Sequence, residues 1–123
     1  MSDLWSALSI AAGGGAGAVI RYLVDSAFPA DRRARFPWGI LTVNLTGSFA
    51  IGVVTGLALE HPAAMVVSVG FLGGYTTFST ASVDTVQLLV RRRYGAAIAN
   101  GIGALGAATG LAICGVLLGA ALA

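Results

Sequence analysis

The segment GFLGGYTTFSTASVD, residues 70–84, holds the residue types best suited to binding an ion. It combines a glycine pair, a run of hydroxyl side chains and an acid, whereas its neighbours AAMVVSV and TVQLLV are apolar. Most residues of the run 73–80 are poor helix formers, so the run predicts a break in a helix. A break frees carbonyl groups that suit a cation and amide groups that suit an anion. We therefore expect an ion site in this segment.

Two further polar residues lie within apolar sequence. Asn44 stands in TVNLTGSF, and its amide carries donors that lipid cannot satisfy. It either joins neighbouring helices or presents its NH2 group to a permeating anion. Arg21 lies in the first apolar segment, where a charge costs about 3 to 10 kcal/mol unless it reaches water. It either extends to the interface or lines an aqueous vestibule that concentrates anions.

The elements that position these residues are predicted from the composition. The 123 residues are 57% hydrophobic and 10% charged, with a mean hydropathy of +0.88, which lies outside the range of soluble domains. A bilayer core needs about 20 apolar residues per helix. The sequence predicts an all-α membrane protein in which residues 1–123 form a single domain of four transmembrane helices. The predicted helices are 4–28, 38–59, 63–90 and 94–122.

The basic residues are distributed unevenly. Six of the seven lie in the first and third connectors: Arg32, Arg33, Arg35, Arg91, Arg92 and Arg93. The opposite side, which holds both termini and the turn EHP, has none. By the positive-inside rule the arginine connectors are cytoplasmic and both termini are extracytoplasmic, in a multi-pass protein of the cell membrane. Glycine recurs in all four predicted helices, which favours close helix packing.

Three segments resemble the Fluc (CrcB) family of fluoride channels: GGGAGAVIRY, PWGILTVNLTGSFAIG and GFLGGYTTFSTASVD. The resemblance covers the first three predicted helices in order and spacing, and the fourth follows in length. It implies a fluoride-selective channel subunit, not an enzyme, that exports fluoride from the cytoplasm by passive permeation. It also implies an antiparallel, dual-topology dimer with the third helix broken in mid-membrane, two pores along the interface and a structural Na+ at the centre.

The resemblance also assigns roles to residues. The implied fluoride-pore residues are Asn44, Phe78, Ser79, Thr80 and Arg21. The main-chain carbonyls of Gly73 and Thr76, two from each subunit, would hold the Na+. The expected partners are fluoride, membrane lipid and a second subunit in the opposite orientation. No nucleic-acid partner is expected.

The chain departs from the family pattern at several positions. They are Ile40, Ala81, Asp84, Asn100 and Ala104. Ala81 stands where the family has a second phenylalanine, so a homodimer would have incomplete phenylalanine sets in both pores. A chain with so strong an arginine bias cannot easily supply an inverted copy of itself. We therefore hypothesise a two-gene heterodimer, in which a paralogous partner is oppositely oriented and only one of the pores conducts.

Two other functions are consistent with the sequence. A small multidrug exporter of the four-helix type needs a carboxylate in its first helix, where this chain has Arg21, and its embedded acid is Asp84 in the third. A non-conducting assembly subunit of a channel pair would need only the glycine-rich faces, and the residues Ala81 and Ala104 favour it.

Overall fold

The structure, a computed structural model, describes residues 3–123, and this range contains only helices and their connections. The expectation of an all-α protein is therefore confirmed. The π-helical segments are η1 (Val66–Leu72) and η2 (Ala99–Gly103). The α-helices are α1 (Asp3–Ser26), α2 (Ala30–Arg35), α3 (Trp38–Leu57), α4 (Ala63–Met65), α5 (Gly73–Tyr75), α6 (Phe78–Val90), α7 (Tyr94–Ile98) and α8 (Ala104–Leu122).

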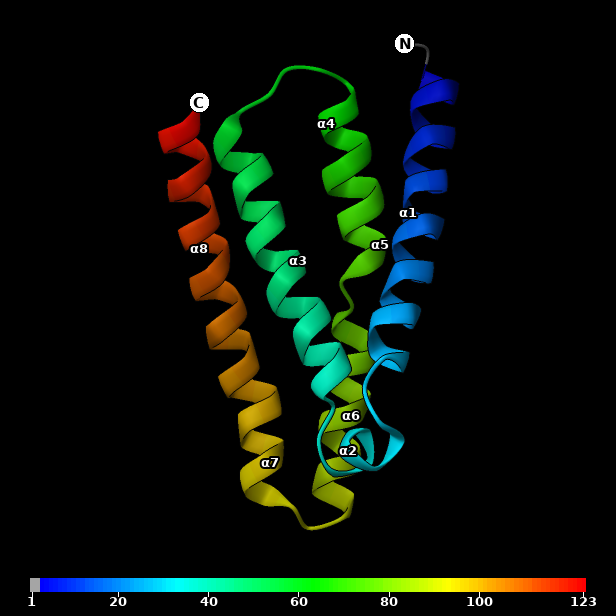
Figure 1. Ribbon diagram of the computed structural model, residues 1–123, viewed down its shortest axis with the longest axis vertical. Helices are drawn as coiled ribbons and strands as arrows, with labels where there is room; N and C mark the ends of the chain where they lie inside the picture. The colour runs from blue at the N-terminus through cyan, green and yellow to red at the C-terminus, as the bar shows by residue number, and fades with distance from the viewer. Residues whose placement is uncertain (1–2) are drawn as a thin grey trace.

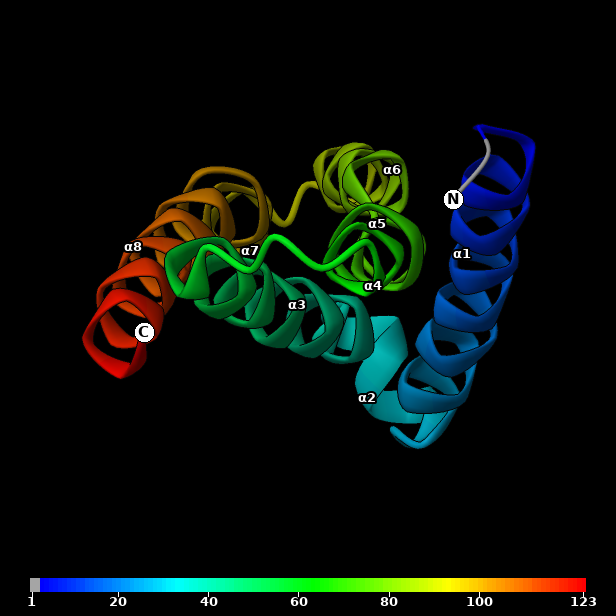
Figure 2. The ribbon, with the colours of Figure 1, turned by 90° about the horizontal axis from the view of Figure 1, so that it is seen from above.

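The chain runs up and down between two ends (Figure 1). The start of α1, the turn 58–62 and the end of α8 lie at one end, and α2 lies with the turn 91–93 at the other. Seen from above, α4, α5 and α6 lie between α1 and the pair formed by α3 and α8 (Figure 2). The guanidinium of Arg91 donates from Nη1 to the carbonyl of Ala34 at 2.8 Å. The two arginine connectors therefore share one end, as the sequence predicts.

Three helical stretches among the described residues are long and apolar enough to cross a membrane: Asp3–Ser26, Trp38–Leu57 and Tyr94–Leu122. The buried apolar side chains of this range are few, namely Ile40, Val43, Leu72, Leu88 and Ala97. Many large apolar side chains are instead exposed, a surface that lipid or another subunit would cover. The chain is thus a multi-pass membrane protein. Residues 63–90 are divided among four shorter elements, so a fourth span there remains a prediction.

The helix boundaries follow local chemistry. The predicted starts at 38, 63 and 94 and the predicted ends at 90 and 122 agree with the structure. The first helix ends at Ser26 instead of 28, because the residue before Pro29 is biased away from helical backbone. The second predicted helix, which is α3, ends at Leu57 instead of 59, because Ala58 adopts a left-handed conformation with φ 52°.

The first connector holds a helix that was not predicted from the sequence. We expected residues 29–37 to be a connection, but Ala30–Arg35 form α2. Pro29 lies directly before its first turn, where the missing N–H costs nothing. Asp31 lies in the first turn and arginines in the last, an order that complements the helix dipole.

Helices α3 and α8 contact each other through their backbones. A Cβ atom at Gly52 would overlap the carbonyl of Ala112, and one at Gly115 would overlap the carbonyl of Phe49. Gly56 and Gly119 repeat this arrangement one turn along. Small residues four apart let membrane helices approach this closely. The packing interpretation of these glycines is therefore confirmed.

A second glycine seam joins α1 to η1 and α5. A Cβ at Gly17 would overlap the carbonyl of Phe71, and one at Gly74 would overlap the backbone of Gly14. By contrast, Gly106 and Gly110 on α8 have open space around them, so they pack against nothing within residues 3–123.

Replacing Gly52 by Ala should weaken the contact between α3 and α8. The added methyl group must push the helices apart, which costs about 1 to 3 kcal/mol. Gly15→Ala in α1 is the matched control, because its added methyl group meets open space. Unfolding in mixed micelles with increasing SDS, followed by far-UV circular dichroism, measures both variants. Equal transition midpoints for the two would contradict the seam.

Candidate ion pathway

The helical backbone is interrupted at Thr76 and Thr77. Helix α5 ends at Tyr75 and α6 begins at Phe78. Between them Thr76 has φ −78° and ψ 154°, and Thr77 has φ −149° and ψ 115°, so both are extended. This extended step turns N–H and C=O groups of the backbone away from the partners with which they would form hydrogen bonds in a continuous helix.

Asn44 of α3 pairs with the extended step through both ends of its amide. Its Nδ2 donates to the Thr77 carbonyl at 2.9 Å, and its Oδ1 accepts from the Thr77 N–H at 2.8 Å. In a helix that N–H would donate to the Gly73 carbonyl, which therefore loses its helical donor. The helix-joining interpretation of Asn44 is confirmed. Nδ2 makes only this hydrogen bond within residues 3–123, so its second N–H is available to a further acceptor.

Thr77 organises the start of α6. Its Oγ1 accepts from the Thr80 N–H at 3.2 Å, as an N-cap does, and donates to Thr80 Oγ1 at 3.0 Å. Ser79 Oγ lies 3.3 Å away. The Thr77 side chain is buried, and it was not among the predicted site residues. The signal was present, because threonine three residues before another polar residue is typical of a helix start.

A cavity of about 500 Å³ lies beside the step, between α3, α6 and the η2–α8 region. The polar residues of its wall are Asn44, Ser48, Thr76, Thr77, Ser82, Thr85 and Asn100. Phe78 also lines it and is 80% exposed. Of the predicted pore residues, the structure therefore brings Asn44 and Phe78 to this cavity. Ser79, Thr80 and Arg21 are not part of its wall.

Asn100 forms a second amide connection on the cavity wall. It is buried, and its Nδ2 donates to the Ala81 carbonyl at 3.2 Å and to Thr85 Oγ1 at 2.9 Å. This ties η2 to α6. From the sequence, Asn100 was recognised only as a departure from the family pattern. Its position within an apolar helix, like that of Asn44, was the signal for a polar contact between helices.

Arg21 lies beside the step and contacts its backbone. Its Nη1 donates to the Thr76 carbonyl at 3.5 Å, and the residue is partly exposed. The glycine seam between α1 and α5 allows this approach, because it holds α1 against the end of α5. A guanidinium here gives the step a positive field that attracts anions.

The oxygen atoms of the step partly fit a hard cation. The Gly73 carbonyl has lost its helical donor, because the Thr77 N–H donates to Asn44 instead. The space around Gly73 is open: an added Cβ atom would meet its nearest neighbour, the carbonyl oxygen of Ser68, only at 3.8 Å. The Thr76 carbonyl points out of the helical direction but already faces Arg21. Carbonyl oxygens suit such cations, but two from one chain are too few. A second subunit or water would have to supply the remaining ligands.

Comparison with known proteins identifies the family. The family model described as "CrcB-like protein, Camphor Resistance (CrcB)" matches residues 8–119. The chain is 43% identical over 116 residues to "Fluoride-specific ion channel FluC 1" of Leifsonia xyli subsp. xyli, which covers 91% of this chain and 85% of that protein.

Two further relatives agree. The chain is 43% identical over 114 residues to "Fluoride-specific ion channel FluC" of Nitrobacter winogradskyi, covering 89% of this chain and 90% of the relative. It is 45% identical over 87 residues to "Fluoride-specific ion channel FluC 2" of Mycobacterium tuberculosis, covering 71% and 69%. With the match extending over nearly its whole length, this chain belongs to the CrcB family.

Proposed function

We propose that the chain is a subunit of a fluoride-selective channel, through which fluoride leaves the cytoplasm by passive permeation. The observation that carries the proposal is the extended step at Thr76 and Thr77, held by Asn44 beside a cavity with a polar wall. Relatives that share most of its length are named fluoride-specific channels. A channel needs no catalytic residues, so we expect no enzymatic activity.

The chemistry of the cavity suits a small, strongly hydrated anion. Such an ion enters a pore only where several donors replace its water. The second N–H of Asn44 is one donor, and the hydroxyl of Ser48, one turn along α3, is another. Ser82 and Thr85 now donate to carbonyls of their own helix and would rotate to serve the anion. The Phe78 ring offers a weakly positive edge that binds an anion without holding it.

A single chain forms only part of such a pathway. Phe78 is 80% exposed, and the open faces at Gly106 and Gly110 pack against no residue in the described part of the chain. An antiparallel second subunit would cover these surfaces and complete two pores. In this dimer residues 63–90, the third predicted helix, would also span the membrane, with the break in mid-membrane. The carbonyls of Gly73 and Thr76 from both subunits would hold a Na+, which adds a fixed positive charge.

The second subunit is proposed to be a paralogue. Six of the seven arginines lie at one end, so the positive-inside rule orients the chain with that end cytoplasmic and both termini outside. An inverted copy would violate the rule. Ala81 contributes no ring to the cavity wall, which leaves one pore without its full phenylalanine set. The numbered names FluC 1 and FluC 2 among the relatives agree with paired genes.

The two alternatives are less well supported. The acid that an exporter would use, Asp84, does not line the cavity beside Asn44 but a small cavity with Arg33 and Arg91 at the arginine end. The non-conducting assembly subunit keeps some support, because Ala81 and Ala104 both line the large cavity and offer an anion nothing.

Asn44→Ala should lower fluoride efflux by about tenfold or more, because the variant loses both the second N–H and the pairing that fixes the step. The measurement uses proteoliposomes of the assembled channel and a fluoride electrode. Thr42→Val is the matched control on the same helix: the Thr42 hydroxyl donates to the Trp38 carbonyl and does not line the cavity. An Asn44→Ala channel as fast as the Thr42→Val channel would refute the pathway.

Assembly with a paralogue that carries its arginines in the opposite connectors should produce fluoride efflux, whereas this chain alone should produce little. The reason is that the chain alone supplies neither an inverted copy nor a ring at position 81. Efflux from liposomes with each chain singly and with both together measures this. Antiparallel dimers of this chain alone with full efflux would overturn the heterodimer but leave the channel function standing.

A further inference from the structure

The two arginine connectors are joined into one surface. Arg91 Nη1 donates to the Ala34 carbonyl at 2.8 Å, and the Arg93 guanidinium donates to the Arg35 carbonyl. Both acceptors belong to the last turn of α2, where carbonyls lack partners within the helix. The turn 91–93 is thus held against α2. We define the arginine surface as Arg32, Arg33, Arg35, Arg91, Arg92 and Arg93, all of them exposed.

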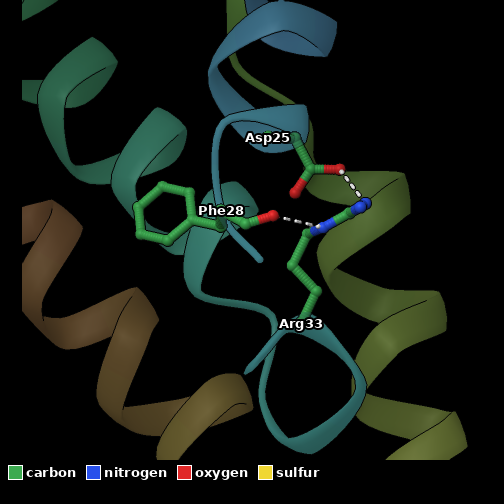
Figure 3. Close-up of polar contacts among 3 residues, drawn as sticks. All are labelled: Asp25, Phe28 and Arg33. Carbon is green, nitrogen blue, oxygen red and sulfur yellow. Dashed lines mark hydrogen bonds and ion pairs between the residues drawn. The ribbon is translucent and has the colours of Figure 1, made fainter. Parts of the chain in front are cut away.

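Half of these guanidinium groups have partners within the chain. Besides Arg91 and Arg93, Arg33 donates from Nε to the Phe28 carbonyl at 3.1 Å, and its Nη1 lies 3.8 Å from Asp25 Oδ2 (Figure 3). Within residues 3–123 the side chains of Arg32, Arg35 and Arg92 have no hydrogen bond or ion pair. These three remain available to an external anion.

The arginine surface also carries more positive charge than the neighbouring carboxylates balance. Six arginines at this end face three aspartates, Asp25, Asp31 and Asp84, so three positive charges are left over. Asp25 already pairs with Arg33. Asp84 lines a cavity of about 60 Å³ together with Arg33 and Arg91. The Asp84 carboxylate in the wall of this cavity would repel an anion inside it. The uncompensated positive charge is therefore available on the outer surface of the protein.

An apolar stripe leads to the arginine surface. Val83, Val86 and Val90 share one face of α6 and are 55%, 56% and 77% exposed. None of them lines the large cavity, so the stripe is separate from the candidate ion pathway. The helix ends at Val90, directly before Arg91. An acyl chain along this stripe would place its phosphate at the level of the arginines.

We propose that the arginine surface binds an anionic phospholipid. The phosphate lies on Arg32, Arg35 and Arg92, and an acyl chain lies along Val83 and its neighbours on the stripe. Clusters of this size directly outside a membrane helix attract anionic lipid headgroups. The exposed Trp38 and Tyr94 agree with this level, because such side chains favour the membrane interface. The site goes beyond the proposed channel function and does not depend on it.

Native mass spectrometry of the purified full chain tests the site with two lipids of matched acyl chains. Phosphatidylglycerol should be retained at least about tenfold better than phosphatidylcholine, because each arginine near the lipid adds roughly a fivefold preference for the anionic headgroup. The triple variant R32Q/R35Q/R92Q should lose this preference. The matched variant R32K/R35K/R92K should keep most of it, because the charge is retained.

Further arms keep the result interpretable. If the glutamine variant does not fold, as judged by far-UV circular dichroism, raising the salt concentration should still reduce the preference of the wild-type chain, since surface charges are screened. Inorganic phosphate at the lipid's concentration should displace little phosphatidylglycerol, because it lacks the acyl chain. Equal retention of the two lipids, an unchanged preference in a folded glutamine variant, or full displacement by phosphate would each overturn the proposal.

Discussion

The pair of hydrogen bonds between the Asn44 amide and the backbone of Thr77 is the interaction on which the rest of the candidate pathway depends. In an apolar environment an unpaired N–H and C=O would each cost several kcal/mol. One side chain satisfies both, so the backbone can leave the helix at Thr76 and return to it at Phe78. Without this pairing, the cost of the unpaired backbone groups would favour a continuous helix, and the carbonyl groups of the step would pair within that helix.

The glycine seams bring the other groups to the step. Because the backbones of α1 and α5 touch at Gly14 and Gly74, the Arg21 guanidinium reaches the Thr76 carbonyl. The seam between α3 and α8 does not touch the step, but it holds in place the helix that carries Asn44. Larger side chains would separate these helices by more than a hydrogen bond can span. The polar contacts at the step therefore depend on the close packing of the helices at the glycine seams.

Much of this arrangement can be predicted from the sequence, because the length of an apolar segment and the helix propensity of its residues determine local structure. Apolar length predicted the helices, and the poor helix formers between Gly73 and Thr80 predicted where the backbone changes. The partners of polar groups could not be predicted, since they depend on which helices become neighbours. Asn44 thus had two open interpretations, and Thr77 was not singled out. The short helix α2 was missed because apolar period gives no signal for a polar segment of six residues.

The charge of the step explains how a cavity without charged residues on its wall could favour an anion. Arg21 approaches the Thr76 carbonyl from within the chain, and the proposed Na+ would bind carbonyls of the same step from the dimer centre. Both are cations; Arg21 does not line the cavity, and the proposed Na+ would lie behind the same backbone step. A positive group lining the path itself would bind fluoride too firmly to let it leave, whereas one behind the backbone attracts it without direct contact. Selectivity for anions would then come from the backbone step, and passage from the neutral amide and hydroxyl donors.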